Sequence, residues 1–453
     1  MFTPMTLETA TGLLRAGDAL RAGRACRGMV ASDPHDAEAY NLLGCAELMA
    51  GGNAAASTVL ARAAAVTPTG PIQGNLALAL YRIDRHRPSI RAARRAASLE
   101  PDLGDAYLHM GQSLQRELAM DEAIDAFRRT RALDPDWLQG MELLAEALLL
   151  SGRYQAGAGL FYAYQCANTV WADGLGLKAG QIRLPDAGTV LLVSDARLGD
   201  ALQFCRYAAA LARRGLRVAV ECQPPLARLL ARAKGVDRVL VHGDPRPAAP
   251  AVPMHMLLHL LADEWPRIGD TVPYLDAEAS AVDRWRHRLG NGPGLKVGLV
   301  WAGRSDGRDD RLRSPGLDAF SPIFEVEGAD FFALQLGDGR AALATSPLAR
   351  RLTDLGPDLA DLAETAAAMT ALDLVVTSDT SAAHLAGALG RPTLVALPYA
   401  PSWRWLLHRS DSPWYPTMRL FRQVAPRDWI APMREIRRTL RSIADHRPGL
   451  RME

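Results

Sequence analysis

The spacing of apolar residues changes near residue 187 and divides the chain into two parts. In the first part, apolar positions recur three and four residues apart, which is typical of amphipathic helices. In the second part, short apolar runs of strand type alternate with helical stretches. This pattern predicts an all-helical first third, followed by an α/β region with parallel sheets and crossover helices.

An internal repeat organises the helical part. Pro34, Pro68, Pro101 and Pro135 follow one another at spacings of 34, 33 and 34 residues, in register with the apolar positions. In each copy, small residues let two helices approach closely, and the proline ends the second helix because it lacks a backbone donor. The region resembles tetratricopeptide repeats, with about four copies over residues 3–136 and a degenerate capping copy at 142–164. Ordinary amphipathic helices with chance prolines are the alternative.

The resemblance to tetratricopeptide repeats implies a partner. Such arrays present a concave groove formed by the first helix of each pair, which normally holds a peptide or protein. We therefore expect a protein or peptide partner in the groove, although the sequence does not identify it.

The strand-type runs form two series. The first contains TVLLVS, LRVAVEC and RVLVHG, and the second contains KVGLVWAG, DFFALQLG, LDLVVTS and TLVALP. A proline-rich loop at 243–253 and a polar helix at 277–294 separate them. We predict a multidomain chain with a repeat array at 1–165 and two doubly wound halves at 185–275 and 290–453. A ligand cleft is expected between the halves, at the carboxyl ends of the strands.

Three loops at predicted strand ends carry candidate chemistry. After the first strand, Gly199 permits a tight turn that leaves Asp200 exposed at a helix start, either as a general base or as a helix cap. After the KVGLVWAG strand, an arginine-rich loop offers donors for phosphate, although a solvated mixed-charge loop is the alternative. Its arginines are Arg304, Arg308, Arg311 and Arg313.

The third loop is SDTSAAHLAGALGRP, residues 378–392. Asp379, Thr380 and Ser381 are helix-capping residues, and His384 lies on the same face of the first turn as Thr380. Unpaired backbone N–H groups at such a helix start form an anion site. A capped core helix with a hydrogen-bonded histidine is the alternative.

Together these loops resemble the heptosyltransferase-type glycosyltransferases of family 9, which have the two-domain GT-B fold. The resemblance rests on SDTSAAHLAGALGRPTLVALP, RLGDALQF, VGLVWAGRSDGRDDRLRS and the segment at 400–423. The order of repeats and enzyme domain is similar to that of the O-GlcNAc transferases. Two positions depart from the pattern: Arg197, where relatives commonly have glycine, and the pair Pro315–Gly316.

The resemblance implies roles for individual residues. Asp200 would be the catalytic base, and Arg311 or Arg313 would meet the donor diphosphate, with Arg304 in the same loop. Gln335 would lie near the nucleoside. Asp379, Thr380, Ser381 and His384 would bind the donor. Trp403 and Trp405 either stack on a sugar or, as we favour, pin an irregular loop to the core.

The expected activity is metal-independent, inverting transfer of a sugar from a nucleotide-linked donor to a hydroxyl, with no cofactor and no bound metal. A protein acceptor held by the repeats is one possibility, and a glycolipid or saccharide acceptor is another. A catalytically inactive scaffold with a nucleotide-binding GT-B domain is the alternative function. A nucleotide-sugar epimerase is disfavoured by the repeats and by the lack of paired acid and base carboxylates.

Composition and charge limit the classes of protein to which the chain can belong. Apolar residues make up 49% and charged residues 23% of the chain, and no apolar run suggests a membrane span. The 52 Lys and Arg nearly balance the 50 Asp and Glu, which gives no general case for nucleic acid. No secretory signal is evident, so we expect a cytoplasmic protein whose five scattered cysteines are reduced.

Overall fold

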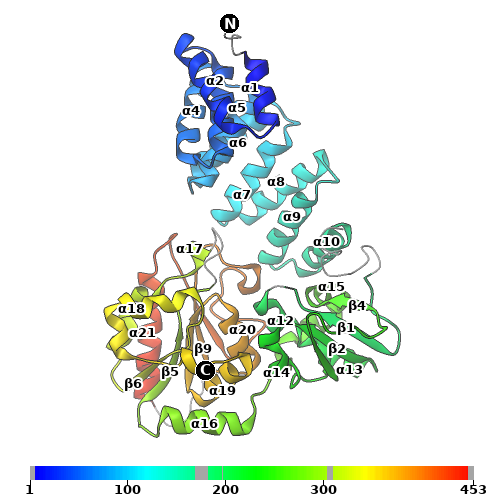
Figure 1. Ribbon diagram of the computed structural model, residues 1–453, viewed down its shortest axis with the longest axis vertical. Coiled ribbons are helices and arrows are strands. Elements are labelled where there is room, and N and C mark those ends of the chain that lie inside the picture. The colour runs from blue at the N-terminus through cyan, green and yellow to red at the C-terminus, as the bar shows by residue number, and fades with distance from the viewer. Residues whose placement is uncertain (1–5, 169–181, 196, 304–309, 447–453) are drawn as a thin grey trace. The chain divides into compact units, whose positions relative to one another are not determined.

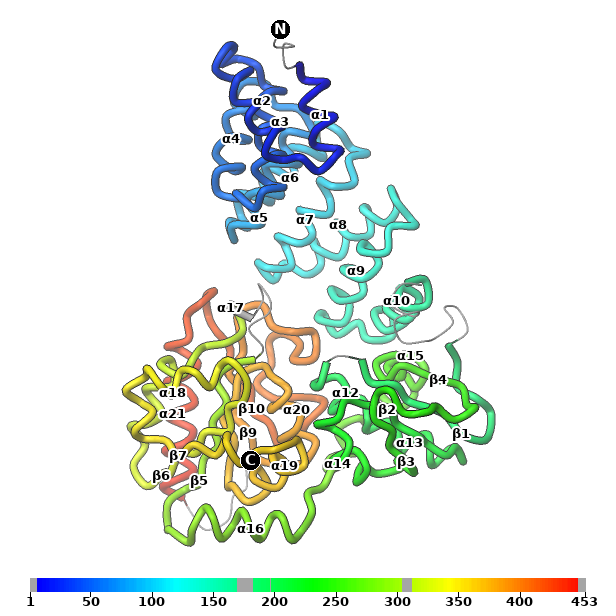
Figure 2. The backbone as a smooth tube through the Cα atoms, in the orientation of Figure 1, coloured from blue at the N-terminus to red at the C-terminus, as the bar shows by residue number. Residues whose placement is uncertain are grey.

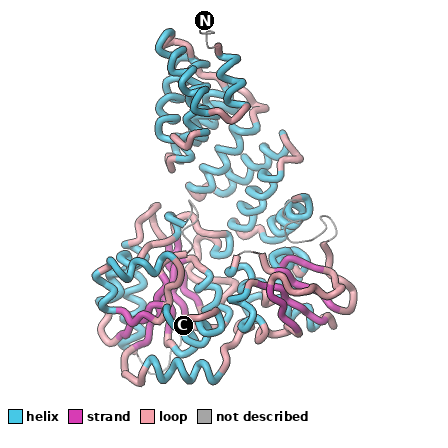
Figure 3. Tube along the Cα trace, viewed as in Figure 1, coloured by secondary structure: helices cyan, strands magenta, loops and turns pink. Residues whose placement is uncertain are grey.

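A computed structural model describes residues 6–168, 182–195, 197–303 and 310–446, with only the backbone of residues 310 and 311. Two compact units make up the chain, Met1–Ser151 and Gly152–Glu453. The first is helical and the second contains all the described strands (Figure 3). None of the helices within the described ranges is both long enough and apolar enough to cross a membrane.

The first unit is a stack of antiparallel helix pairs (Figure 1). Each predicted proline lies two residues beyond the second helix of a pair, as expected of a residue that cannot continue a helix. The 34-residue hairpin repeat is therefore confirmed, and the unit is a solenoid of the tetratricopeptide type. Its helices are α1 Leu7–Arg15, α2 Ala19–Ser32, α3 Ala37–Met49, α4 Asn53–Val66, α5 Gly70–Arg82, α6 His86–Leu99, α7 Gly104–Arg116, α8 Met120–Leu133 and α9 Leu138–Leu150.

Glycines allow the helices of a pair to pack closely. A Cβ atom at Gly111 of α7 would lie 2.6 Å from Cε1 of Phe127, which is fully buried on α8. Gly44 of α3 stands in the same relation to Leu60 of α4. The predicted small-residue positions are thus the points where the paired helices touch.

The first sheet of the second unit has four parallel strands in the order β3-β2-β1-β4. Its strands are β1 Thr189–Val193, β2 Arg217–Cys222, β3 Arg238–Val241 and β4 Ala251–Pro253. We predicted three strands and assigned residues 243–253 to a loop. That assignment was wrong at its end, because β4 pairs with β1 over three residues, too few to give a recognisable apolar alternation.

The second sheet has six parallel strands in the order β10-β9-β8-β5-β6-β7. The four predicted runs form β5 Leu295–Val300, β6 Ala329–Ala333, β8 Leu374–Ser378 and β9 Thr393–Leu397. The edge strands β7 Leu352–Asp354 and β10 Met418–Arg422 were not predicted. β7 has only three residues, and β10, MRLFR, has arginine at two of its five positions, so neither forms the apolar run of a recognisable strand.

Two helices of the second unit connect or cover the sheets. The amphipathic pattern of MREIRRTLRSIADHR, residues 433–447, predicts a terminal helix that we expected to pack on the first half. The structure contradicts this, because Met433, Ile436 and Leu440 of α21, Ile430–Asp445, are buried in the core of the second sheet. The linker helix α16, Ala279–Leu289, joins the two sheets along the chain (Figure 2).

The stretch ALQFCRYAAALARRG, residues 201–215, has the apolar spacing of one continuous helix, but a buried arginine interrupts it. Two helices, α12 Leu198–Phe204 and α13 Tyr207–Arg213, meet at Arg206, whose side chain is 1% exposed. Its Nη1 donates to the carbonyl oxygens of Ile268 and Trp414 at 3.1 and 3.0 Å, and its Nη2 donates to the hydroxyl of Tyr274 at 3.0 Å. One guanidinium thereby joins a helix of the first sheet to the segment preceding β10 of the second.

Helix α10, Tyr154–Ala167, belongs to the second unit, whereas we had counted it with the repeats, which we ended at residue 165. The Tyr154 ring lies 3.9 Å from that of Trp265, and Trp265 makes an edge contact with Trp414 at 5.1 Å between ring centroids. These apolar contacts join α10 to the α/β unit.

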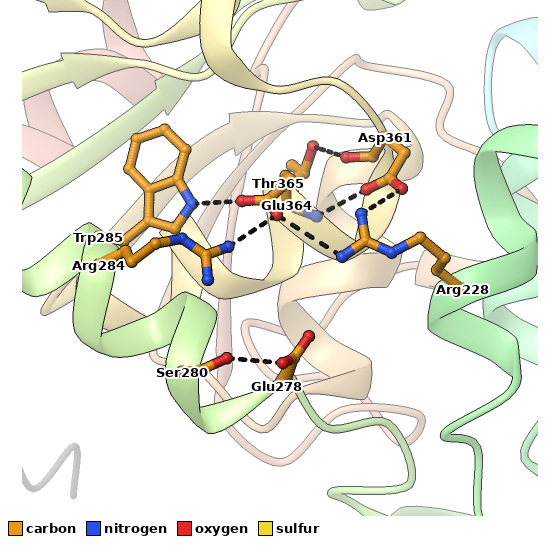
Figure 4. A network of polar contacts seen from close by, with 8 residues as sticks. All are labelled: Arg228, Glu278, Ser280, Arg284, Trp285, Asp361, Glu364 and Thr365. Atoms are coloured by element: carbon orange, nitrogen blue, oxygen red, sulfur yellow. Dashed lines mark hydrogen bonds and ion pairs between the residues drawn. The ribbon is translucent and has the colours of Figure 1, made fainter.

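A polar network joins α14, Ala227–Leu230, to α16 and to the start of α19, Leu362–Ala371 (Figure 4). Arg228 pairs with Asp361 at 2.8 Å and lies 3.6 Å from Glu364. Glu364 also accepts hydrogen bonds from Arg284 at 3.2 Å and from the indole of Trp285 at 3.0 Å. The network connects helices of both sheets.

Gly111→Ala is expected to destabilise the repeat unit by about 1–3 kcal/mol, because the added methyl group overlaps the buried ring of Phe127. Chemical denaturation of the full chain, followed by circular dichroism, measures the effect. Gly28→Ala is the matched control, since no atom lies within 4 Å of a Cβ at that helical position. It should leave stability unchanged or raise it by up to about 1 kcal/mol. Equal effects of the two substitutions would contradict close packing at Gly111.

Candidate functional site

The loop after β1 brings Asp200 to the second sheet. Gly199 and Asp200 lie in the first turn of α12, and a Cβ at Gly199 would be 3.0 Å from Cδ2 of His384 and 3.9 Å from Cα of Ser381. We expected Gly199 to permit a tight turn, but its φ is not in the left-handed region. Glycine is needed there because α12 and α20, Ser381–Ala388, approach each other closely.

We expected Asp200 to be exposed, either as a general base or as a helix cap, but the structure shows neither exposure nor capping. Its side chain is 13% exposed and forms an ion pair with Arg404, while Arg197 occupies the N-cap position. The Arg197 N–H donates to the Asp195 carboxylate at 3.0 Å from an extended backbone conformation, so this position does not require the glycine of the family pattern. The other departure, Pro315–Gly316, precedes a 3-10 helix at Leu317–Glu325, and the φ of +75° at Gly316 suits glycine.

His384 is buried on α20, where its ring is enclosed by aromatic side chains. Its Nδ1 is 2.8 Å from the hydroxyl of Tyr415, and its ring stacks on Trp405 at 5.4 Å between centroids. Burial, with smaller contributions from Arg404 and Arg206, lowers the pKa of His384 well below its ordinary value. His384 is therefore neutral at physiological pH, with its Cδ2 edge facing Gly199.

The start of α20 carries a buried carboxyl group. Asp379 is 7% exposed, and burial raises its pKa against the opposing effect of Arg313 and Arg404. Thr380 is the N-cap, but its hydroxyl lies 3.2 Å from that of Thr377 and makes no side-chain capping bond with the described residues. Ser381 follows as the first residue of α20. The first-turn amides are thus not capped by Thr380, so they could donate to an anion.

The predicted arginine loop is described only at its end. Arg304 and Arg308 lie outside the described residues. Arg311 lies on the short helix α17, Asp310–Arg313, of which only the backbone is described at Arg311. Arg313 lies close enough to Asp379 to lower the pKa of that carboxyl, so the end of this loop adjoins the start of α20.

The side-chain amide of Gln335 forms hydrogen bonds with backbone groups. Its side-chain oxygen accepts from the N–H groups of Trp301 and Ala302, both at 2.9 Å, and its nitrogen donates to the carbonyls of Ala302 and Leu336. Since it is 2% exposed and its amide bonds to backbone groups, this side chain braces the exit of β5.

Arg404 was missed by sequence reasoning. It lies in the 3-10 turn Trp403–Trp405 after β9, and its Nε donates to Gln203 Oε1 at 2.7 Å beside the ion pair with Asp200. The motif WRW places an arginine between two aromatic residues, which is a signal for an anchored cation, but no sequence spacing links it to Asp200.

His255 is a second residue that was missed. It follows β4, is 7% exposed, and its Nδ1 lies 3.8 Å from the Asp195 carboxylate. Burial lowers the pKa of His255, while Asp195 and Asp200 act to raise it. The ring of Phe161 on α10 makes an edge contact with it at 5.5 Å. Because β4 was read as loop, nothing in the sequence placed His255 at a strand end.

The aromatic residues of the 400–423 segment differ in burial. Trp405, Trp414 and Tyr415 are fully buried, and Trp405 supports His384 from one side. Trp403 is partly exposed and makes an edge contact with Trp414 at 5.9 Å. Burial therefore assigns packing to Trp405, whereas Trp403 stays accessible to a ligand.

The site thus combines two carboxyl groups, two arginines and a neutral histidine at the carboxyl ends of two parallel sheets. Asp200 supplies a candidate base, although its carboxylate is paired with Arg404 here, and Arg313, Arg404 and the start of α20 can hold an anion. Within the ranges that are described, no group of three or more His, Cys, Asp or Glu side chains is arranged to hold a metal ion.

Comparison with known proteins finds partial similarities. No protein-family model matches the chain. Protein FlbA of Caulobacter vibrioides is 31% identical over 201 residues, which is 40% of this chain and 33% of that protein. The chain therefore spans about one third of the length of this relative.

Solved structures with partial similarity include MamA from Desulfovibrio magneticus RS-1, which is 18% identical over 35% of this chain and 89% of its own, with a TM-score of 0.33. YrrB, a TPR protein with an unusual peptide-binding site, is 16% identical over 38% and 90%, with a TM-score of 0.33. The assignment of the helical repeats rests on the hairpins α1–α8 themselves.

Asp379→Asn is expected to raise the melting temperature at neutral pH. Folding raises the pKa of the Asp379 carboxyl above the value of 3.8 that it has in the unfolded chain. Above pH 3.8 the unfolded state therefore gains from ionisation of this group before the folded state does, so the free energy of unfolding falls with rising pH until the pH passes the folded-state pKa. The stabilisation by asparagine should therefore be largest near pH 7.5 and shrink as the pH falls toward about 4. Thermal unfolding of both proteins across this range measures it, and a difference independent of pH would contradict a raised pKa.

Proposed function

We propose that the protein is a metal-independent glycosyltransferase of GT-B type that transfers a sugar from a nucleotide-activated donor to a hydroxyl group. One observation carries the proposal: Gly199 lies against the first turn of α20, so that Asp200 and His384 converge from the ends of two separate parallel sheets. This is where ligands bind in open α/β sheets. The resemblance of the surrounding motifs to family 9 glycosyltransferases supports the same reaction.

In the proposed reaction, Asp200 accepts the proton of the acceptor hydroxyl as its oxygen attacks the anomeric carbon of the donor sugar. A new carbon–oxygen bond forms, and the bond from that carbon to the diphosphate breaks. The nucleoside diphosphate leaves with the bonding electrons. Inversion at the anomeric carbon follows from the family resemblance.

The second sheet would hold the leaving diphosphate. The amides at the start of α20 and the guanidinium of Arg313 supply donors where negative charge develops, which is an effective form of transition-state stabilisation. Neutral His384, fixed by Tyr415 and Trp405, presents an imidazole edge at the same place without adding charge. In this arrangement, nitrogen donors would stabilise the negative charge of the leaving diphosphate.

For the acceptor, we propose a protein or peptide held by the repeats. Asn41 of α3 and Asn75 of α5 occupy equivalent positions 34 residues apart, and Asn75 Nδ2 donates to Asn41 Oδ1 at 2.9 Å. Side-chain amides on successive first helices can exchange such bonds for bonds to a peptide backbone. A glycolipid or saccharide acceptor, with the repeats binding a partner enzyme, is the alternative.

A second candidate function is a nucleotide-binding scaffold without activity. The ion pair between Asp200 and Arg404 favours it, because a carboxylate engaged by a guanidinium is not free to accept a proton. However, Arg404 belongs to the site itself, so the pair does not withdraw Asp200 from the place where the two sheets meet.

Asp200→Asn tests the choice between enzyme and scaffold. We expect it to lower transfer by about 10²–10⁴-fold, the usual contribution of a general base, while nucleoside diphosphates still bind. A panel of nucleotide sugars and candidate acceptors, with product detected by mass spectrometry, measures the rate. Asp283→Asn, an exposed aspartate on α16, is the matched control and should transfer normally. Undiminished transfer by Asp200→Asn would rule out this base.

The double substitution of Asn41 and Asn75 by alanine tests the acceptor assignment. It should lower kcat/KM for a protein acceptor by about tenfold or more, since two backbone-binding amides are lost, and leave the Kd of the nucleotide donor unchanged. Steady-state kinetics and calorimetry separate the two effects. Unchanged kcat/KM would place the acceptor elsewhere.

A further inference from the structure

Arg404 connects the two sides of the site. Its Nη2 donates to Asp200 Oδ1 and its Nε donates to Gln203 Oε1, both on α12, while its Nη1 donates to the hydroxyl of Ser402 at 3.2 Å. The Arg404 and Asp200 side chains are 14% and 13% exposed. An arginine from a loop of the second sheet is therefore held by residues that belong to the first.

The same guanidinium lies near the start of α20. It contributes with Arg313 to the electrostatic environment of Asp379, the residue before the N-cap Thr380. Arg404 thus contacts the candidate base directly and also lies close enough to the start of α20 to influence Asp379 and His384.

The Asp200 carboxylate and a donor diphosphate would compete for this guanidinium. When a carboxylate oxygen of Asp200 accepts a hydrogen bond from Arg404, one of its lone pairs is occupied. That lone pair cannot accept the proton of an incoming hydroxyl. A diphosphate offers more acceptor oxygens and more charge than one carboxylate, and guanidinium groups bind phosphate bidentately. Breaking a buried ion pair is costly when one charge is left alone, but here an arriving diphosphate replaces the lost partner.

We propose that Arg404 exchanges Asp200 for the donor diphosphate, so that donor binding frees the base. The inference rests on the proposed function and adds the order in which the two substrates must act. Without donor, the base is occupied and an acceptor hydroxyl is not activated. With donor bound, Arg404 holds the phosphate and Asp200 accepts the proton, so the donor binds before the acceptor reacts.

The test is the affinity of four proteins for one nucleoside diphosphate: wild type, Asp200→Asn, Arg404→Met and the double variant. The probe is whichever of UDP, GDP, ADP, CDP and dTDP most raises the melting temperature of the wild type. Asp200→Asn removes the competitor for Arg404, so we expect the Kd to fall by about fivefold or more. Arg404→Met should raise the Kd, and adding Asp200→Asn to it should then change little.

A control separates competition from simple charge repulsion. Asp195→Asn also removes a carboxylate near the site, but Asp195 contacts the Arg197 N–H and His255. Its effect on the Kd should be smaller, and it should be the same whether Arg404 is present or replaced by methionine. If Arg404→Met does not fold, Arg404→Lys replaces it, since lysine keeps the charge and loses the planar fork.

The outcomes distinguish the two levels of the proposal. If none of the five nucleoside diphosphates binds the wild type, the glycosyltransferase function fails and the exchange fails with it. If one binds, but Asp200→Asn changes the Kd equally in the wild type and in the Arg404→Met variant, the exchange is wrong and the donor site stands. A Kd that falls only when Arg404 is present supports the exchange.

Discussion

The α/β unit depends on the burial of one positive charge, that of Arg206, which has no carboxylate partner among the residues that the structure describes. Arg206 interrupts the α12–α13 helix and donates to Gln203, Ile268, Trp414 and Tyr274, and its guanidinium also lies 4.8 Å from the ring centre of Tyr415. Carbonyl oxygens and aromatic faces replace the solvent that the charge lost. Because these partners come from both sheets and from the segment between them, the charge is stabilised only when all three are assembled.

The candidate site inherits its geometry from this arrangement. The ring of Tyr415 packs against Arg206, and its hydroxyl is the hydrogen-bond partner of His384. Helix α12 carries Asp200 and also Gln203, whose carbonyl accepts from Arg206. Small residues at Gly199 and along α20 then let the two helices meet. The polar groups are thus positioned by packing beneath them, which is what holds catalytic groups in fixed relation.

Sequence predicted the long features well and the short ones poorly. Seven strands and the helical repeat follow from apolar spacing, because each buries enough side chains to leave a pattern. The edge strands β4 and β7 have only three residues each, and β10 has arginine at two of its five positions, so none of them leaves a recognisable apolar pattern. The contact of Arg404 with Asp200 joins positions 204 residues apart, so no local rule reveals it. Gln335 shows the converse error: its type suits a ligand, but backbone groups already use its amide.

The position of α10 affects how such a chain can change in length. Its Tyr154 fills the space beside Trp265 and Trp414, and its Phe161 covers His255, so this last helix of the repeat pattern serves as part of the α/β unit. Insertion or deletion of whole hairpins before Ser151 leaves these contacts unchanged. The number of hairpins can therefore differ between such chains without loss of these contacts, whereas α10 is held in place by them.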